Sequence, residues 1–291
     1  AAAGQIRLAH AYQEAMAQQN LHTAQLLLTI SDTEARRRYL NARNTINALL
    51  KVGAVPVINE NDTVATDEIR FGDNDRLAAR VAEMASADCL ILLSDIDGLY
   101  SSDPRHDENA RLIPEVNKIT PEIENMAGRA GTTFASGGMV TKLAAARIAL
   151  NAGCHMAITD GTQLNPLTAL ENGATCTWFV PSATPRSARK RWILGSLSPA
   201  GTIIVDDGAA GALSAGKSLL PAGVKSITGE FGRGDAVIVC KSNGVELGRG
   251  LSAYSARDAR IIMGHKSAEI EQLLGYRGRD EMIHRDDLAL I

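Results

Sequence analysis

Paired glycines precede a lysine at the predicted start of a helix, a pattern suited to binding phosphate. The segment reads Ser-Gly-Gly-Met-Val-Thr-Lys over residues 136–142. Backbone N–H groups ahead of a helix point toward an anion at the positive end of the helix dipole. Lys142, in the first turn, adds a point charge that can reach a phosphoryl group; a simple glycine turn is the alternative. The candidate phosphate-binding residues are Ser136, Gly137, Gly138, Met139, Val140, Thr141 and Lys142.

Amide and carboxylate side chains gather after an earlier predicted strand. Asn59 stands at the carboxyl end of that strand, and Asn61, Asp62, Asn74 and Asp75 follow it. Open α/β sheets bind their ligands at this edge. Such side chains suit the ammonium group of a small ligand, while backbone N–H groups can bind its carboxylate. We predict a ligand site here; the alternative is that these residues only form turns and cap the next helix.

A third candidate follows a short, strongly apolar run. The run ends at Ser94 and Asp95 and continues as Ile-Asp-Gly-Leu-Tyr over residues 96–100. A hydroxyl and acids at the carboxyl edge of a sheet can hold a ribose, a base or the water around Mg²⁺. Asp95 could instead only cap the turn.

Other apparent motifs carry less weight. Gly211–Ser218 matches the GxxxxGK[ST] expression, but Pro221 and Gly223 follow at once and prevent the helix that phosphate binding needs. The six histidines and four cysteines show no metal-ligand spacing, so we expect no protein-bound metal and no disulfide framework. The scattered cysteines fit a reducing cytoplasm.

The elements that must position these residues alternate along the first part of the chain. Short β-rich runs occur at 24–29, 54–59, 89–95, 154–159 and 175–180, and helical patterns lie at 33–50, 75–86, 120–127, 139–152 and 166–171. This alternation is typical of strands joined by crossover helices. The fold class predicted is α/β, with a mostly parallel open sheet sandwiched by helices.

The composition and periodicity of the sequence change after residue 182. Residues 183–198 carry proline, serine and several basic residues without periodicity, which indicates a linker between domain 1–182 and domain 199–291. Beyond it, strands at 202–206, 225–228 and 236–240 and the Asn243-Gly244 turn predict a small, mainly β module. Two short helices are expected to begin at Ser255 and Ser267.

Composition limits the possible functions. The chain has 291 residues, 45% of them hydrophobic and 22% charged, with a net charge of -3. These values are typical of a globular protein rather than a disordered chain or a polyanion binder. No apolar stretch is long enough to cross a bilayer.

In this order, Asn59–Asp62 with Gly72–Asp75, Ser94–Tyr100 and Ser136–Lys142 resemble the amino acid kinase family. The C-terminal module is similar to the PUA domain that bacterial glutamate-phosphorylating members carry, and the resemblance covers nearly the whole chain. It implies transfer of the γ-phosphoryl group of ATP to the side-chain carboxylate of glutamate. The product, γ-glutamyl phosphate, opens proline biosynthesis.

The resemblance also implies roles for individual residues. Asp62 and Asn74 would hold glutamate with Asn59 beside them, and Ser94 and Asp95 would contact ATP. The glycine-rich segment would wrap the phosphates, Lys142 would neutralise charge on the moving phosphoryl group, and Asp75 would orient the catalytic lysines. Mg²⁺, feedback inhibition by proline, a homodimer or homotetramer and a cytoplasmic location are further implications.

Two departures from the family pattern concern the same site. Ser94 and Ser136 stand where the family usually has threonine, a change that keeps the hydroxyl. The family also begins with a strand carrying a lysine and glycine that face phosphate, followed by a glycine-rich loop, whereas this sequence starts within the next helix. A polypeptide that began at Ala1 is therefore expected to bind ATP poorly and turn over little.

Two other functions remain as alternatives. PUA modules elsewhere bind RNA, but acidic residues slightly outnumber basic ones from residue 201 onward, which disfavours RNA binding. A catalytically incomplete regulatory protein, assembling through the helical pattern at 33–50, is the second alternative.

Overall fold

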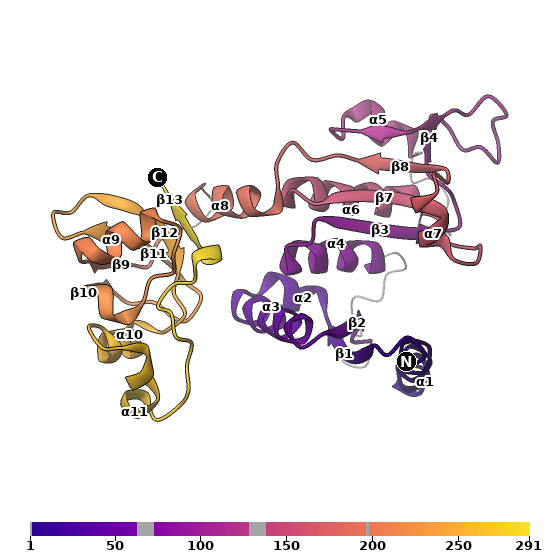
Figure 1. Ribbon diagram of the computed structural model, residues 1–291. Coiled ribbons are helices and arrows are strands. Elements are labelled where there is room, and N and C mark those ends of the chain that lie inside the picture. Colours follow the sequence, from indigo (N-terminus) through magenta and orange to yellow (C-terminus); the bar gives the residue numbers. More distant parts are fainter. Residues whose placement is uncertain (1, 63–72, 128–137, 196–197) are drawn as a thin grey trace. The chain divides into compact units, whose positions relative to one another are not determined.

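The computed structural model describes residues 2–62, 73–127, 138–195 and 198–291 (Figure 1). The chain divides into two compact units, Ala1–Pro185 and Arg186–Ile291. Within the described ranges, no helix combines the length and the apolar composition that crossing a bilayer requires.

Unit 1 alternates strands and helices along the chain, as the sequence pattern predicts. Its elements are α1 (Ala2–Ala17), β1 (His22–Leu28), α2 (Ile30–Glu34), α3 (Arg36–Lys51), β2 (Ala54–Glu60), α4 (Asp73–Ala85), β3 (Cys89–Ser94), β4 (Leu99–Tyr100), β5 (Leu112–Ile113), β6 (Glu115–Val116), α5 (Pro121–Met126), α6 (Met139–Ala152), β7 (His155–Asp160), α7 (Pro166–Glu171) and β8 (Cys176–Phe179).

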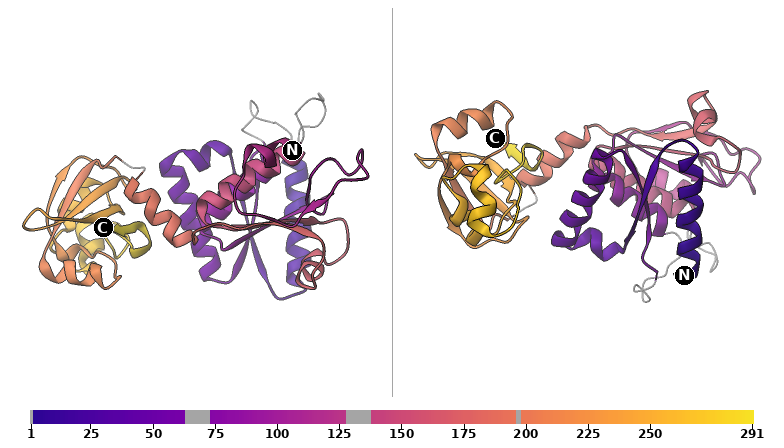
Figure 2. Two further views of the ribbon diagram at one scale, coloured as in Figure 1. Left: turned by 90° about the horizontal axis from the view of Figure 1, so that it is seen from above. Right: turned by 60° about the horizontal axis from the view of Figure 1, so that its bottom comes forward.

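The strands of unit 1 are mostly parallel, which confirms the predicted fold class. Among the described residues, β1 pairs with β2 in parallel, and a four-stranded sheet has the order β3-β7-β8-β6. In that sheet β3 and β7 run parallel, with Cys89 opposite His155 and Ser94 opposite Asp160. The helix α1 lies beside the β1–β2 pair (Figure 2), where Gln5 Nε2 donates to the Glu60 carbonyl at 3.2 Å.

Two strand pairs among the described residues of unit 1 depart from the parallel pattern, because β4 pairs antiparallel with β5, and β8 pairs antiparallel with β7. The helix between them, α7, has only six residues. A helix of that length spans about 9 Å, roughly half the length of a six-residue strand. The chain therefore does not cross the sheet between these strands, and β8 starts near the edge at which β7 ends.

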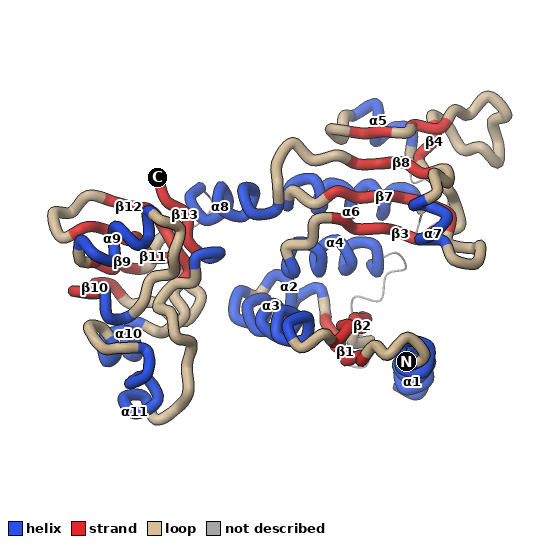
Figure 3. The backbone as a smooth tube through the Cα atoms, viewed as in Figure 1, coloured by secondary structure: helices blue, strands red, loops and turns tan. Residues whose placement is uncertain are grey.

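Helices α4 and α6 pack closely against each other beside β3 and β7 (Figure 3). Small side chains make this approach possible, since Ala79, Ala145, Ala146 and Ala149 are all completely buried. Larger residues of the strands, among them the fully buried Ile158, complete the same core. Alanine also favours the helical backbone, so local preference and packing agree here.

The helical pattern at 33–50 forms two helices instead of the one that was predicted. Thr29 starts the first, α2, because its hydroxyl accepts the Asp32 N–H at 3.2 Å while the Asp32 carboxylate accepts the Thr29 N–H at 2.8 Å. This capping box moves Thr29 from the predicted strand to the helix boundary. Ala35 then adopts an extended conformation between α2 and α3.

Unit 2 is a mixed β module with short helices. Its sheet has the order β10-β9-β11-β12-β13, in which β9 and β11 are parallel and the other pairs antiparallel. Its elements are α8 (Pro185–Gly195), β9 (Gly201–Val205), α9 (Asp207–Ser214), η1 (Pro221–Gly223), β10 (Val224–Gly229), β11 (Ala236–Lys241), β12 (Glu246–Leu251), α10 (Ala256–Ile262), η2 (Ser267–Glu269), α11 (Ile270–Leu274), η3 (Arg285–Asp287) and β13 (Leu288–Leu290).

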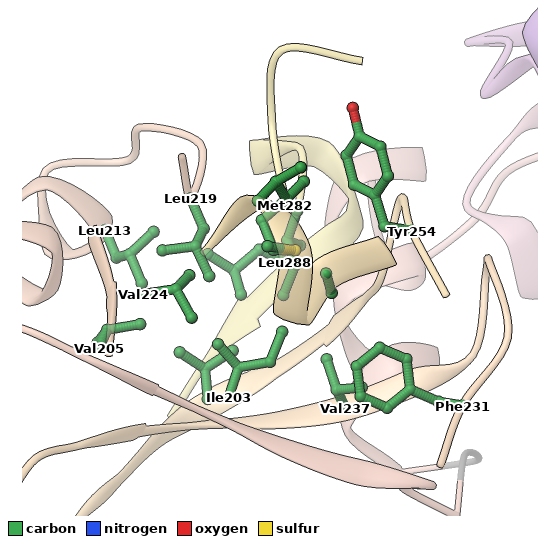
Figure 4. Close-up of a cluster of buried hydrophobic side chains, with 14 of the residues drawn as sticks. Ile203, Val205, Leu213, Leu219, Val224, Phe231, Val237, Tyr254, Met282 and Leu288 are labelled. Atoms are coloured by element: carbon green, nitrogen blue, oxygen red, sulfur yellow. The ribbon is translucent and has the colours of Figure 1, made fainter. Parts of the chain in front are cut away.

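The core of unit 2 lies between the sheet and the short helices (Figure 4). Ile203 and Val237 from the sheet are completely buried, as is Met282 from the segment before β13. Unit 2 therefore has a hydrophobic core of its own. The Gly211–Ser218 motif starts inside α9 and ends beyond it, so no helix begins at its lysine, as the sequence predicted.

The segment 183–198, predicted as a linker between the two domains, contains the helix α8. Contacts with the rest of unit 2 stabilise this helix. Ile193 is completely buried, and Arg249 Nη1 donates to the Leu194 carbonyl at 2.9 Å. Arg189 Nη2 lies 2.6 Å from Asp287 Oδ1, with both side chains at most one tenth exposed.

Replacing Arg189 tests whether α8 is an integral part of unit 2. Arg189→Ala removes the closest positive charge from the buried Asp287 carboxylate, so we expect the unfolding free energy of unit 2 to fall by about 3 kcal/mol. Calorimetry of the whole chain measures the change. Arg191, exposed on the same helix, gives the matched control, and Arg191→Ala should shift the value by less than about 0.5 kcal/mol. Equal shifts in both variants would contradict the assignment.

Candidate functional site

The topology of unit 1 brings the starts of α4 and α6 to one edge of the sheet. Each helix precedes a strand and runs back against it, α4 before β3 and α6 before β7 (Figure 1). The first turn of each helix therefore lies at the edge where β3 and β7 end. Ligands of open α/β sheets bind at this edge.

An ion pair joins these two helix starts. Lys142 Nζ in the first turn of α6 lies 3.2 Å from Asp75 Oδ2 in the first turn of α4. The Lys142 side chain is 11% exposed and the Asp75 side chain 19%. Thr141 Oγ1 lies 2.9 Å from the same carboxylate oxygen. We call these three residues the α4–α6 cluster.

The position of Lys142 is electrostatically unfavourable without a partner. A positive side chain in the first turn of a helix opposes the helix dipole, and burial removes part of its hydration. Asp75 supplies the negative charge that holds the ammonium group there. The cluster thus keeps a lysine next to backbone N–H groups, an arrangement that attracts an anion.

Gly138 precedes α6 with an extended backbone and offers no side-chain cap. A side chain at this position would meet no described atom within 4 Å, so packing among the described residues does not require glycine here. Glycine does allow a ligand to approach the backbone closely. Ser136 and Gly137, the other small residues of the predicted phosphate site, lie outside the described residues.

The next two residues of the predicted phosphate site face different surroundings. The Met139 side chain packs against the core of unit 1, whereas the Val140 side chain is 48% exposed. Neither side chain has a polar group for a phosphate. Any contact of these residues with an anion would therefore come from the backbone.

Ser94 and Asp95 stand where β3 ends, as predicted. Ser94 Oγ donates to Asp95 Oδ1 at 3.1 Å, and Ser94 O accepts the Gly161 N–H at 2.8 Å. The Asp95 side chain is exposed and the Ser94 side chain half-buried. A hydroxyl and a carboxylate are thus available on the edge that carries the α4–α6 cluster.

Asp160 is a residue at this edge that sequence analysis missed. It ends β7 directly opposite Ser94 in the parallel register. Its carboxylate accepts the Thr162 N–H at 2.8 Å and the Thr162 hydroxyl at 2.7 Å, and the backbone bond is the main cause that lowers the Asp160 pKa. The sequence could have indicated Asp160, because this residue directly follows the predicted strand at 154–159 and neighbouring parallel strands end at a common edge.

Asn59, Asp62 and Asn74, the predicted ligand-binding residues near β2, make fewer contacts with one another than the residues of the α4–α6 cluster do. Asn59 is half-buried within β2, and Asp62 lies two residues beyond the end of the strand. Asn74 is exposed and precedes Asp75 in α4. Among the contacts of the described residues, none joins Asp62 to Asn74 or to Lys142. Residues 63–72, between Asp62 and α4, lie outside the described residues.

Within the described ranges, no group of three or more histidine, cysteine, aspartate or glutamate residues could hold a metal ion. The described residues at this edge supply a lysine, a helix start, the Ser94 hydroxyl and the carboxylates of Asp95 and Asp160. These groups can bind and stabilise an anion.

Two family models and several known proteins match this chain. The amino acid kinase family model matches residues 1–160, and the PUA domain model matches residues 201–274. A glutamate 5-kinase of Paramagnetospirillum magneticum is 64% identical over 290 residues, which cover 100% of this chain and 78% of that relative. A glutamate 5-kinase of Rhodospirillum rubrum is 61% identical over 290 residues, which cover 100% and 77%.

Stability measurements can separate the charge of the cluster from its packing. Asp75→Ala leaves the buried Lys142 ammonium without its carboxylate, so we expect the free energy of unfolding of unit 1 to fall by about 2 kcal/mol. Adding Lys142→Met should recover most of that loss, because an apolar side chain of similar length needs no partner. Urea denaturation measures both changes, with Asn74→Ala as the exposed neighbouring control. A double variant as unstable as Asp75→Ala alone would argue against the ion pair.

Proposed function

The chain belongs to the amino acid kinase family and, within it, to the glutamate 5-kinases; from this premise we propose that Asp75 and Lys142 form the centre of its catalytic site. Glutamate 5-kinase catalyses the first step of proline biosynthesis. The reaction transfers the γ-phosphoryl group of ATP to the side-chain carboxylate of glutamate. The product is an acyl phosphate.

The chemistry of this transfer depends on positioning and on charge. The carboxylate of glutamate is already a nucleophile, so the reaction needs no group to remove a proton from it. Negative charge spreads over the oxygens of the phosphoryl group as it moves between donor and acceptor. Fixed positive groups that face these oxygens lower the barrier because they do not have to reorganise.

The observation that supports the proposal is the ion pair between Lys142 and Asp75 at 3.2 Å. In the proposed mechanism Lys142 neutralises charge on the moving phosphoryl group, and Asp75 keeps its ammonium group in place. The N–H groups at the start of α6, beginning at Gly138, bind phosphate oxygens. Ser94 and Asp95 contact the nucleotide from the end of β3.

The residues around β2 are proposed to hold the acceptor. Asp62 and Asn74, with Asn59 beside them, offer carboxylate and amide oxygens to the ammonium group of glutamate. Residues 63–72, which connect Asp62 to α4, are not among the described residues. The support for these roles is therefore the chemistry of the side chains and the place of Asn74 next to Asp75.

Mg²⁺ is proposed to enter with ATP. This ion prefers oxygen ligands and is commonly held by substrate phosphates together with one or two carboxylates. Asp95, exposed at the end of β3, is the described carboxylate that we propose to contact the water around the ion. When bound, the ion would supply further positive charge to the phosphate oxygens.

Three further properties are proposed from family membership alone. They are feedback inhibition by proline, assembly into a homodimer or homotetramer, and a cytoplasmic location. The four cysteines are free thiols, which fits a reducing compartment.

Substrate choice tests the assigned reaction in the full-length protein. With ATP and hydroxylamine, we expect glutamate to give a hydroxamate from the acyl phosphate. Aspartate, one methylene shorter, should react at least about 100-fold more slowly, because a misplacement of roughly 1 Å costs that much. The iron complex of the hydroxamate gives the rate. Comparable rates with both acids would contradict the assigned acceptor.

Removing the lysine tests the proposed catalytic role. Lys142→Ala should lower kcat by about 10²- to 10³-fold, the usual effect of losing one group that stabilises developing negative charge. Lys118, exposed elsewhere in unit 1, is the matched control, and Lys118→Ala should keep the wild-type rate. If Lys142→Ala retains full activity in the same assay, the role assigned to Lys142 is wrong.

A further inference from the structure

The hydroxyl of Thr141 lies between two acceptors at the start of α6. Its Oγ1 is 2.9 Å from Asp75 Oδ2 on α4 and 2.8 Å from the Gly138 carbonyl three residues earlier. A threonine in a helix commonly donates to a carbonyl of the preceding turn. The carboxylate comes from a different helix and is 66 positions away in the sequence.

The single hydroxyl proton has a stronger reason to face Asp75. The Gly138 carbonyl already accepts the Thr141 backbone N–H at 3.1 Å. An ionised carboxylate is also a better acceptor than a carbonyl, since hydrogen bonds to charged groups are shorter and stronger. The Thr141 hydroxyl therefore donates to Asp75.

Asp75 Oδ2 consequently receives two donors from adjacent residues of α6, the Thr141 hydroxyl and the Lys142 ammonium. Adjacent residues of a helix do not point in the same direction. The two donors reach one oxygen from different sides, and together they determine where the carboxylate lies. If only one of them were present, the carboxylate could turn about its side-chain bonds.

We propose that Thr141 is a positioning residue whose hydroxyl holds Asp75 in place while Lys142 interacts with the phosphoryl group. The proposal rests on the proposed function, because it assumes that Lys142 leaves part of its interaction with Asp75 when the substrate binds. The hydroxyl bond does not depend on that movement. Asp75 thus keeps its orientation through the reaction and draws Lys142 back to the same place.

This role differs from a direct contact between the Thr141 hydroxyl and ATP. A hydroxyl that donates to Asp75 has no second proton for a phosphate oxygen. The backbone N–H of Thr141 is likewise directed to Gly138. The loss of the hydroxyl should therefore affect the chemical step more than nucleotide binding.

The test compares Thr141→Val with Thr141→Ser in the full-length protein. Valine keeps the shape of threonine without the hydroxyl, so kcat should fall about tenfold, the effect of losing one hydrogen bond to a charged group. KM for ATP and for glutamate should change less than about twofold. Serine keeps the hydroxyl and should restore most of the rate. Circular dichroism melting shows whether each variant is folded.

A double-mutant cycle with Asp75→Asn gives a second measurement. In that background Thr141→Val should reduce kcat by much less than in the wild type, because the carboxylate that the hydroxyl holds is absent. The same four proteins can be compared by urea denaturation, which requires no activity. Non-additive changes in unfolding midpoint would show the Thr141–Asp75 coupling independently of the reaction.

Several outcomes would overturn the proposal. A raised KM for ATP at unchanged kcat in Thr141→Val would show that the hydroxyl binds the nucleotide. Equal losses in the valine and serine variants, or additive effects in both cycles, would show that it does not act through Asp75. If instead the wild-type protein makes no hydroxamate while the unfolding cycle is non-additive, the proposed function fails and the Thr141–Asp75 contact stands.

Discussion

The site of unit 1 depends on keeping a lysine ammonium group at the positive end of a helix. Two positive elements repel each other there, and partial burial weakens the screening by water. The Asp75 carboxylate, 3.2 Å from Lys142 Nζ, offsets both effects. It comes from a different helix, so the charge pair exists only where α4 and α6 pack together. The close α4–α6 contact, made possible by small side chains such as Ala79 and Ala145, is therefore a requirement of the site.

The parallel order of β3 and β7 explains why other polar residues lie on the same edge. Both helix starts and both strand ends must meet there, because each crossover helix runs back along its strand. Ser94 and Asp160 are register partners at this edge. Phosphoryl transfer to a carboxylate needs such convergence more than it needs a reactive side chain, since positioning and charge supply most of the catalysis.

Sequence patterns predicted the features that depend on neighbouring residues. The strand at 89–95, the glycine at the start of α6 and the Ser255 cap of α10 each have a local cause, and the structure places all three within a residue of the prediction. Features that depend on distant partners were missed. The helix α8 requires contacts such as Arg189 with Asp287, and Asp160 gains its place at the site only through the register of β3 with β7.

The start of α6 has no side-chain cap and no acid in its first turn, which it shares with α3 and α7 but not with three other helices. Helices α5, α9 and α10 begin with a hydroxyl or carboxylate cap from Thr120, Asp206 or Ser255, and each has an acid in its first turn. Helix α6 has neither, and it carries Lys142 at the position where an acid would be favourable. Each of these choices weakens the helix start in the absence of a ligand. A negatively charged ligand offsets all of these unfavourable features, because it accepts hydrogen bonds from the N–H groups and interacts favourably with the helix dipole and the lysine. In the proposed function, the residues that weaken this helix start are the ones that bind the phosphates of ATP.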